Sequence, residues 1–256
     1  MFERELELFR KECEGAAQFF FGHLAINEMA KRRESVLRLL NRNAMFWNTA
    51  AAGMQTAAIV ATGRVFDQGS PHSIDKVLRL AQNHSSIFSK ASLGRRKQAG
   101  ANEPTSWLTA YLESAHVPST ADFRRLRSHI KERRRIYEAR YRDLRHKVYA
   151  HRVVGEDDEL APIVAKTNVR ELERLVLFLL RFYESMWHLY MNGRKPTLGR
   201  LRYTISREGR LSLPRRSARD VHRQMVFETK NVLLGAAAQQ TTAPDSRRRR
   251  TLSGRR

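Results

Sequence analysis

The stretch STADFRRLRSHIKERRRIYEARYRDLRHKVYAHR, residues 119–152, decides the fold of this chain. Its apolar residues recur at intervals of three, four or seven, which places them on one face of an α-helix. These residues are Phe123, Leu126, Ile130, Tyr137, Tyr141, Leu144 and Val148. Pro118-Ser119 is a start signal, because serine is a favourable N-cap. The spacing predicts one long, mostly charged helix over residues 119–152.

A second long helix is predicted near residues 168–191. Asn168 is a good N-cap and Glu171 stands three residues later, which is a capping-box arrangement. Asn192-Gly193 ends the pattern and Pro196 lies just beyond. We expect these two long helices to pack antiparallel within a bundle.

The remaining N-terminal segments also carry the helical period. Helices are predicted over residues 6–33, 35–66, 74–81 (capped by Ser73), 88–98 and 107–114. The fold class is therefore expected to be all-α, a helical bundle of residues 1–193 with a basic C-terminal extension. In that extension, residues 194–238, a small hairpin over 201–212 and a helix over 216–236 are possible. Residues 239–256 are rich in arginine among small polar residues, which predicts a disordered tail.

Charge limits the class of partner. The chain has 48 Lys+Arg against 26 Asp+Glu, a formal net charge of +22. Residues 194–256 hold 17 basic and 4 acidic residues, so +13 of this excess lies in the last quarter of the chain. A strongly basic protein attracts polyanions with an affinity that falls as salt rises. A solvated surface that only aids solubility is the alternative explanation.

Cysteine usage and hydropathy narrow the setting. Cys13 is the single cysteine, which excludes an internal disulfide and a zinc site built from several cysteines. No segment has the apolar length of a signal peptide core or of a membrane helix. We therefore expect a cytoplasmic protein with no membrane partner, and we assign no metal or cofactor.

The end of the long predicted helix carries the candidate chemistry. Arg145 is a fixed cation, and His151 is an imidazole that titrates near neutral pH. Together they are the minimum equipment for cutting RNA without a metal. The spacing alone carries little weight in a chain with 48 Lys+Arg and 9 His. The alternative for His151 is a helix-terminal residue stabilised by the helix dipole.

Four stretches give this motif a context: FWNTAAAGMQTAAIVATGRVFD (46–67), HSIDKVLRLA (72–81), FSKASLGRRK (88–97) and RDLRHKVYAH (142–151). Together they resemble the HEPN superfamily, most closely its abortive-infection branch of AbiU type, over residues 40–190. The resemblance implies a metal-independent endoribonuclease that works as a homodimer, as a toxin or a phage-defence effector. Arg145 matches the motif arginine, His146 the polar position after it, and His151 the motif histidine. Five residues intervene between Arg145 and His151, where four is the commonest spacing.

On an α-helix, six positions correspond to about 9 Å of rise and about 120° of rotation. Arg145 and His151 of one helix therefore cannot easily grip one phosphate together. Two copies related by symmetry can place the arginine of one beside the histidine of the other.

Other residues are assigned supporting roles, each with a plainer alternative. His146 can bind phosphate or lie exposed, and Tyr149 can stack on a base or pack in the core. Arg64 and Asp67 resemble a charged position that faces the site in this branch, although a structural salt bridge is equally consistent. The predicted RNA contacts are Arg133, Arg134, Arg135 and Arg142, with Arg247, Arg248, Arg249 and Arg250 in the tail.

Two other functions remain open from the residues alone. A HEPN-type module with little turnover would bind RNA or a protein partner, such as an acidic antitoxin, through its basic tail. A DNA-associated regulator would show the same charge, although no recognition helix is evident.

Overall fold

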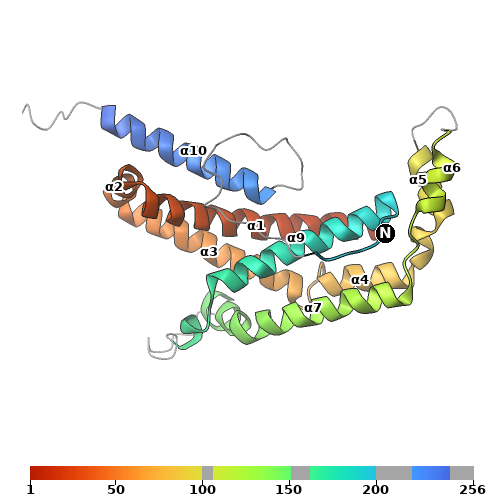
Figure 1. The fold of residues 1–256 in the computed structure, drawn as a ribbon. Helices are drawn as coiled ribbons and strands as arrows, with labels where there is room; N and C mark the ends of the chain where they lie inside the picture. The colour runs from red at the N-terminus through yellow and green to blue at the C-terminus, as the bar shows by residue number, and fades with distance from the viewer. Residues whose placement is uncertain (100–105, 151–161, 200–220, 243–256) are drawn as a thin grey trace, which may run out of the picture. The chain divides into compact units, whose positions relative to one another are not determined.

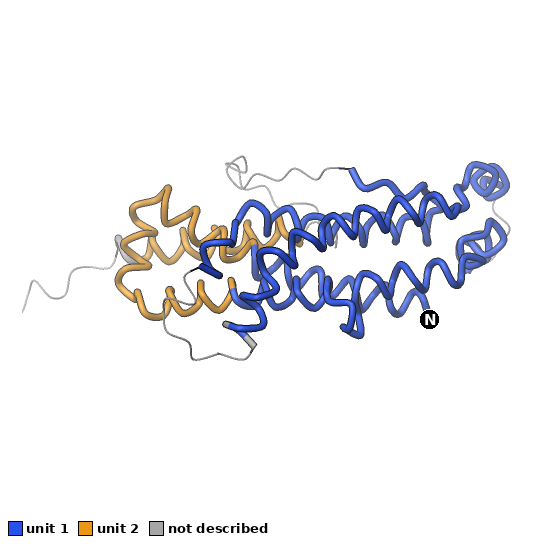
Figure 2. Tube along the Cα trace, turned by 90° about the horizontal axis from the view of Figure 1, so that it is seen from below, with its two compact units in different colours: residues 1–20, 56–203 blue, residues 21–55, 204–256 orange. Residues whose placement is uncertain are grey.

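The structure, a computed structural model, describes residues 1–99, 106–150, 162–199 and 221–242. The chain divides into two compact units. Unit 1 comprises residues 1–20 and 56–203, and unit 2 comprises residues 21–55 and 204–256 (Figure 2). Within the described ranges there is no β-strand, so the predicted all-α fold class is confirmed.

Figure 1 shows the order of the helices. They are α1 (Phe2–Arg32), α2 (Glu34–Arg42), α3 (Ala44–Phe66), α4 (Ile74–Asn83), the 3₁₀-helix η1 (Ser85–Phe88), α5 (Lys90–Gln98), α6 (Leu108–Ser114), α7 (Thr120–Arg140), the π-helix η2 (Leu144–Ala150), α9 (Val169–Asn192) and α10 (Val221–Thr242). None of these described helices has the length and apolar character needed to cross a lipid bilayer.

The two long helices of unit 1, α7 and α9, run antiparallel as predicted (Figure 1). Near one end, Arg140 at the last turn of α7 forms an ion pair with Glu171 at the first turn of α9, at 2.5 Å. Near the other end, the backbone N–H of His116 donates to the carbonyl of Gly193 at 2.7 Å. Residues that precede α7 therefore meet residues that follow α9.

The helix ends follow the capping signals of the sequence. Ser119 accepts from the backbone N–H of Asp122, and the Asp122 carboxylate accepts from the backbone of Ser119, which completes a capping box. Asn168 accepts from the backbone N–H groups of the first turn of α9. Gly193 ends α9 at φ 55°, a left-handed conformation that glycine adopts without a steric penalty.

Burial agrees with the predicted apolar faces. The seven predicted core residues of α9 are buried: Leu172, Leu175, Val176, Leu179, Phe182, Met186 and Leu189. The predicted seam of 119–152 is buried from Phe123 to Leu144. Phe9 of α1 meets Phe182 edge to face, with ring centroids 5.6 Å apart. Helical periodicity in this chain therefore reports the core of unit 1.

Three predicted boundaries are wrong. The helix expected over 35–66 is broken at Asn43, whose φ of −124° and ψ of 49° lie outside the helical region. The helix expected over 119–152 stops being α-helical at Tyr141, and residues 144–150 form a π-helix instead. Residues 239–242, expected to belong to a disordered tail, are part of α10, which continues to Thr242. The possible hairpin over 201–212 lies outside the described residues.

The C-terminal helix belongs to the core of unit 2. Buried residues of α10 pack with buried residues of α2 and of the second part of α1. This cluster contains Ile26, Met29, Val36, Leu39, Leu40, Leu233 and Ala237. Burying apolar surface is the main source of stability here, because fully burying one such large side chain contributes roughly 1.5–3 kcal/mol. The predicted helix of the extension is thus an integral element, with bounds 221–242 in place of 216–236.

Candidate active site

The motif arginine lies where the α-helical pattern of α7 gives way to the π-helix. Tyr141 sits at this junction with its side chain only 1% exposed. Its hydroxyl donates to the carbonyl of Asn168 at 2.5 Å and accepts from the backbone N–H of Asn168 at 3.2 Å. These bonds tie the junction to the start of α9. π-helical turns are rare and often occur at functional sites.

The Arg145 side chain turns back onto α3 and α7. Its Nη1 donates to the Asp67 carboxylate at 2.9 Å and to the Tyr137 hydroxyl at 3.5 Å. The side chain of Arg145 is 17% exposed and that of Asp67 is 44% exposed, so the pair lies at the rim of unit 1. Among the described residues, both of these hydrogen bonds of Arg145 use Nη1.

A glycine of α3 makes this arrangement possible. Gly63 is buried, and a Cβ built on it would lie 2.5 Å from Cδ of Arg145 and 2.5 Å from the hydroxyl oxygen of Tyr137. Both distances are shorter than any van der Waals contact, so a side chain here would displace both residues. The absence of a side chain at Gly63 therefore lets Arg145 lie flat against α3.

Aromatic packing holds the Tyr137 ring in place. The Tyr137 ring stacks on Phe66 with centroids 5.7 Å apart and an interplanar angle of 17°. Phe66 in turn stacks on Phe178 of α9 at 6.4 Å. Three elements, α3, α7 and α9, thus fix the ring whose hydroxyl accepts from Arg145.

At neutral pH, Arg145 stays charged and the Tyr137 hydroxyl stays neutral. Burial acts to lower the pKa of Arg145, but the contacts with Tyr137 and Asp67 outweigh it and raise the pKa above its ordinary value. Burial raises the pKa of Tyr137, so its hydroxyl stays neutral. The site therefore presents a permanent positive charge that is held by the neutral Tyr137 hydroxyl and by the Asp67 side chain.

The other predicted site residues are distributed unevenly around Arg145. Asp67 is in direct contact with it, whereas Arg64 forms an ion pair with Glu12 at 3.0 Å. His146 follows Arg145 and is half-buried. Tyr149 is also half-buried, and burial raises its pKa against the effect of a hydrogen bond with Thr56. His151 lies outside the described residues, so its side chain is not placed.

The predicted RNA contacts on α7 and beyond also differ in environment. Arg135 and Arg142 are exposed. Arg133 pairs with Glu132 at 3.0 Å and lies over the ring of Phe178 at 5.9 Å. Arg134 is only 11% exposed, pairs with Asp75 and donates to the carbonyl of Phe66 at 3.1 Å, which makes it a structural residue. The tail residues Arg247, Arg248, Arg249 and Arg250 lie outside the described residues.

A family model of HEPN domains, described as AbiU2, matches residues 1–206 of the chain. The chain belongs to the AbiU2 family of HEPN domains. The match covers the Arg145 cluster, which consists of Arg145, Asp67, Tyr137 and Gly63. It also extends beyond residues 40–190, over which the sequence resembles the family. No match to the chain was found among curated proteins or among solved structures.

Two residues of the candidate site are not predicted from the sequence. The sequence places Tyr137 only in the apolar seam of the predicted helix 119–152, and Gly63 only in the stretch 46–67 that carries the family resemblance. One signal was present for each: a tyrosine hydroxyl needs a partner when buried, and Gly63 stands one turn before Asp67. Neither signal indicates contact with Arg145, because that contact joins segments far apart in the chain.

Proposed function

We propose that this AbiU2 domain is a metal-independent endoribonuclease that acts in phage defence or as a toxin. The observation that supports it is the Arg145 guanidinium, which is held at Nη1 by Asp67 and Tyr137. In this proposal its other donors, Nε and Nη2, bind the phosphate. Guanidinium groups bind phosphate oxygens through paired, charge-assisted hydrogen bonds. A cation held in place before the substrate arrives needs no reorganisation during the reaction.

The proposed reaction is an internal transfer within RNA. The 2′-oxygen attacks the adjacent phosphorus, a base takes the 2′-hydroxyl proton, and the bond from phosphorus to the 5′-oxygen breaks. An acid then gives a proton to the departing 5′-oxygen. The products are a 2′,3′-cyclic phosphate and a 5′-hydroxyl. Arg145 stabilises the negative charge that builds on the phosphoryl oxygens, and His151 serves as the general acid–base group, a role typically worth roughly 10²- to 10⁴-fold in rate.

A homodimer completes the proposed site. The attachment of Nη1 to Asp67 restricts the reach of Arg145, and the π-helix changes the angle between it and later residues from the α-helical value. A second copy related by two-fold symmetry would bring its own His151 to the Arg145 of its partner. The resemblance to HEPN domains favours this arrangement.

Cleavage of single-stranded RNA in EDTA tests the proposal. The full chain should release fragments with cyclic phosphate ends, and the Arg145→Gln and His151→Ala variants should lose this activity. Arg124→Gln is the matched control, since it removes an exposed arginine of α7 away from the cluster. Binding of RNA without cleavage, unchanged in Arg145→Gln and His151→Ala, would instead identify a binding module with no turnover.

A further inference from the structure

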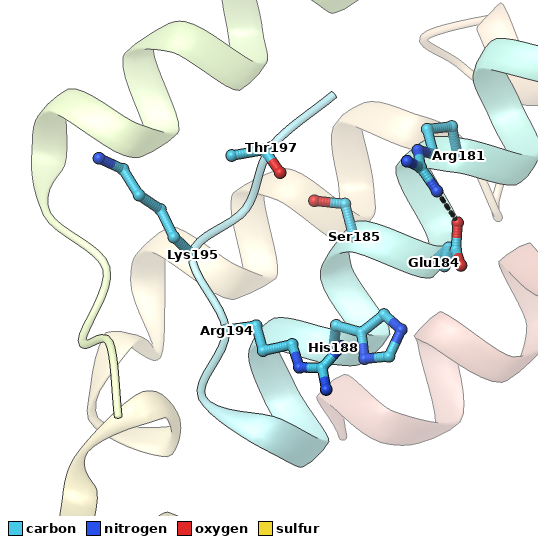
Figure 3. A pocket seen from close by; sticks show the side chains of 7 residues that line it. All are labelled: Arg181, Glu184, Ser185, His188, Arg194, Lys195 and Thr197. Atoms are coloured by element: carbon cyan, nitrogen blue, oxygen red, sulfur yellow. Dashed lines mark hydrogen bonds and ion pairs between the residues drawn. The ribbon is translucent and has the colours of Figure 1, made fainter. Parts of the chain in front are cut away.

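A second polar site lies along the C-terminal half of α9, in unit 1. It is a pocket of about 230 Å³ between α9 and the segment Arg194–Thr197 that follows it. Figure 3 shows the side chains that line it. Glu171, which pairs with Arg140 at the end of α7, lies 14 residues before Ser185. This separation corresponds to about 20 Å along the axis of α9. The pocket is therefore separate from the Arg145 cluster.

A buried hydroxyl in this pocket has an unused hydrogen-bonding capacity. Ser185 is 8% exposed, and its Oγ has no hydrogen-bond partner among the described residues. Figure 3 shows this hydroxyl pointing toward the segment that carries Thr197. A buried hydroxyl without a partner is destabilising, because it has lost its hydrogen bonds to water. A ligand oxygen in the pocket would supply the partner.

The charge of the pocket favours an anion. Arg181, Arg194 and Lys195 bring three positive charges, and Glu184 brings one negative charge that pairs with Arg181 at 2.5 Å. The balance is +2 before any protonation of His188. Figure 3 shows the Lys195 amine extending away from the other groups, so it acts through charge at longer range. The dipole of α9 disfavours an anion at this end, but its partial charge of about −0.5 is smaller than the excess of +2.

We propose that this pocket binds the phosphate group of a phosphate monoester. Such a group carries about −1.5 to −2 charges at pH 7 and three acceptor oxygens, which suits a balance of +2 with guanidinium and hydroxyl donors. A carboxylate has two oxygens and one charge, and it would leave donors unmatched. The volume lies below the roughly 300–1,000 Å³ of sites that enclose whole drug-sized ligands, so the pocket holds the phosphate and leaves the rest of the molecule outside.

This site goes beyond the proposed ribonuclease reaction. The products of that reaction end in a cyclic phosphodiester and a hydroxyl, and neither is a phosphate monoester. Binding at the pocket and cleavage at Arg145 can therefore fail independently of one another.

Calorimetric titration of the full chain with adenosine 5′-monophosphate, and separately with inorganic phosphate, tests the proposal. We expect saturable binding at one site per chain. Arg194→Gln should weaken the affinity about 10-fold, since it removes charge-assisted bonds, and Ser185→Ala should weaken it several-fold. Arg174→Gln, which removes an exposed arginine of the same helix outside the pocket, should leave the affinity unchanged. RNA cleavage should be the same in all three variants.

The two probes identify the source of the phosphate. Equal affinities would show that the phosphate alone is recognised, and tighter binding of the nucleotide would show that the attached ester adds contacts. Absence of saturable nucleotide binding would overturn the proposal. An equal loss of affinity in Arg174→Gln and Arg194→Gln would overturn it too, because it would show diffuse attraction to a basic surface. Arg194 is exposed, so its variant is expected to fold.

Discussion

The Asp67 carboxylate accepts a hydrogen bond from Nη1 of Arg145 at 2.9 Å, and this contact joins the residue after α3 to the π-helical turn that carries the motif. Asp67 and Arg145 lie 78 positions apart in the chain. The acidic partner holds Nη1 of the guanidinium in place.

Asp67→Asn removes the charge of this partner with little change in shape. We expect RNA cleavage to fall about 10- to 100-fold, because a small misplacement of a catalytic group has effects of that size. The melting temperature should change little, since Asp67 is 44% exposed and such pairs contribute about 0–1 kcal/mol. Glu34→Gln, which breaks the exposed pair with Arg38, serves as the control. Unchanged cleavage in Asp67→Asn would remove Asp67 from the site.

Gly63→Ala places a methyl group 2.5 Å from both Arg145 and Tyr137. We expect a loss of about 1–3 kcal/mol in the free energy of unfolding, as for other overpacked interiors, together with loss of cleavage. Gly53→Ala is the matched control within α3, because a Cβ there meets nothing within 4 Å. It should stabilise the helix by roughly 0.5–1 kcal/mol. Chemical denaturation of both variants measures the difference, and equal stabilities would contradict the close approach at Gly63.

Tyr141→Phe leaves the backbone groups of Asn168 without their buried partner. We expect a loss of about 1–3 kcal/mol in the free energy of unfolding. Burial also raises the pKa of Tyr141 above its ordinary value of about 10. The unfolded chain then releases this proton first as pH rises, so stability is intact below pH 10 and falls above it. Denaturation followed against pH should show a smaller alkaline loss in Tyr141→Phe, and an identical loss would contradict the assignment.

Mixing two inactive variants tests the composite site. Arg145→Gln and His151→Ala should each be inactive as homodimers. If each site takes its arginine from one chain and its histidine from the other, a refolded equimolar mixture regains about a quarter of the wild-type activity. Half of the dimers are then mixed, and each mixed dimer has one intact site. A mixture that stays inactive would show that both groups act within one chain.

Removing residues 243–256 deletes six arginines while leaving α10 whole. We expect weaker RNA binding and a flatter dependence on salt, by about 0.7 in the logarithmic slope for each phosphate of a single strand that the tail no longer neutralises. Fluorescence anisotropy across a salt series measures the slope. Truncation at residue 239 would also shorten α10 close to the buried Ala237, so removal of residues 243–256 is the better test. An unchanged slope would exclude the tail from RNA binding.

Local signals in the sequence predicted most of the fold. Ser73, Ser119, Asn168 and Gly193 mark helix ends correctly because capping depends on neighbouring residues alone. The break at Tyr141 was not predictable, because the apolar pattern continues through Leu144 and Val148, whereas the hydroxyl of Tyr141 bonds to Asn168 in a distant segment. The same limit applies to the site. The motif predicts Arg145 as a site residue and the family resemblance predicts Asp67, whereas Tyr137 and Gly63 meet Arg145 only through a contact between distant segments.

The π-helix also gives meaning to the length of the motif. Each of its hydrogen bonds closes a loop that is one residue longer than in an α-helix. The interval from Arg145 to His151 is one residue longer than the commonest spacing of the motif, and the wide turn over Leu144–Ala150 has the capacity to absorb that insertion. In an ordinary α-helix, inserting one residue rotates everything downstream by about 100°. A π-helical turn avoids that rotation because it holds the additional residue. The register of this short segment matters as much as the identity of its residues.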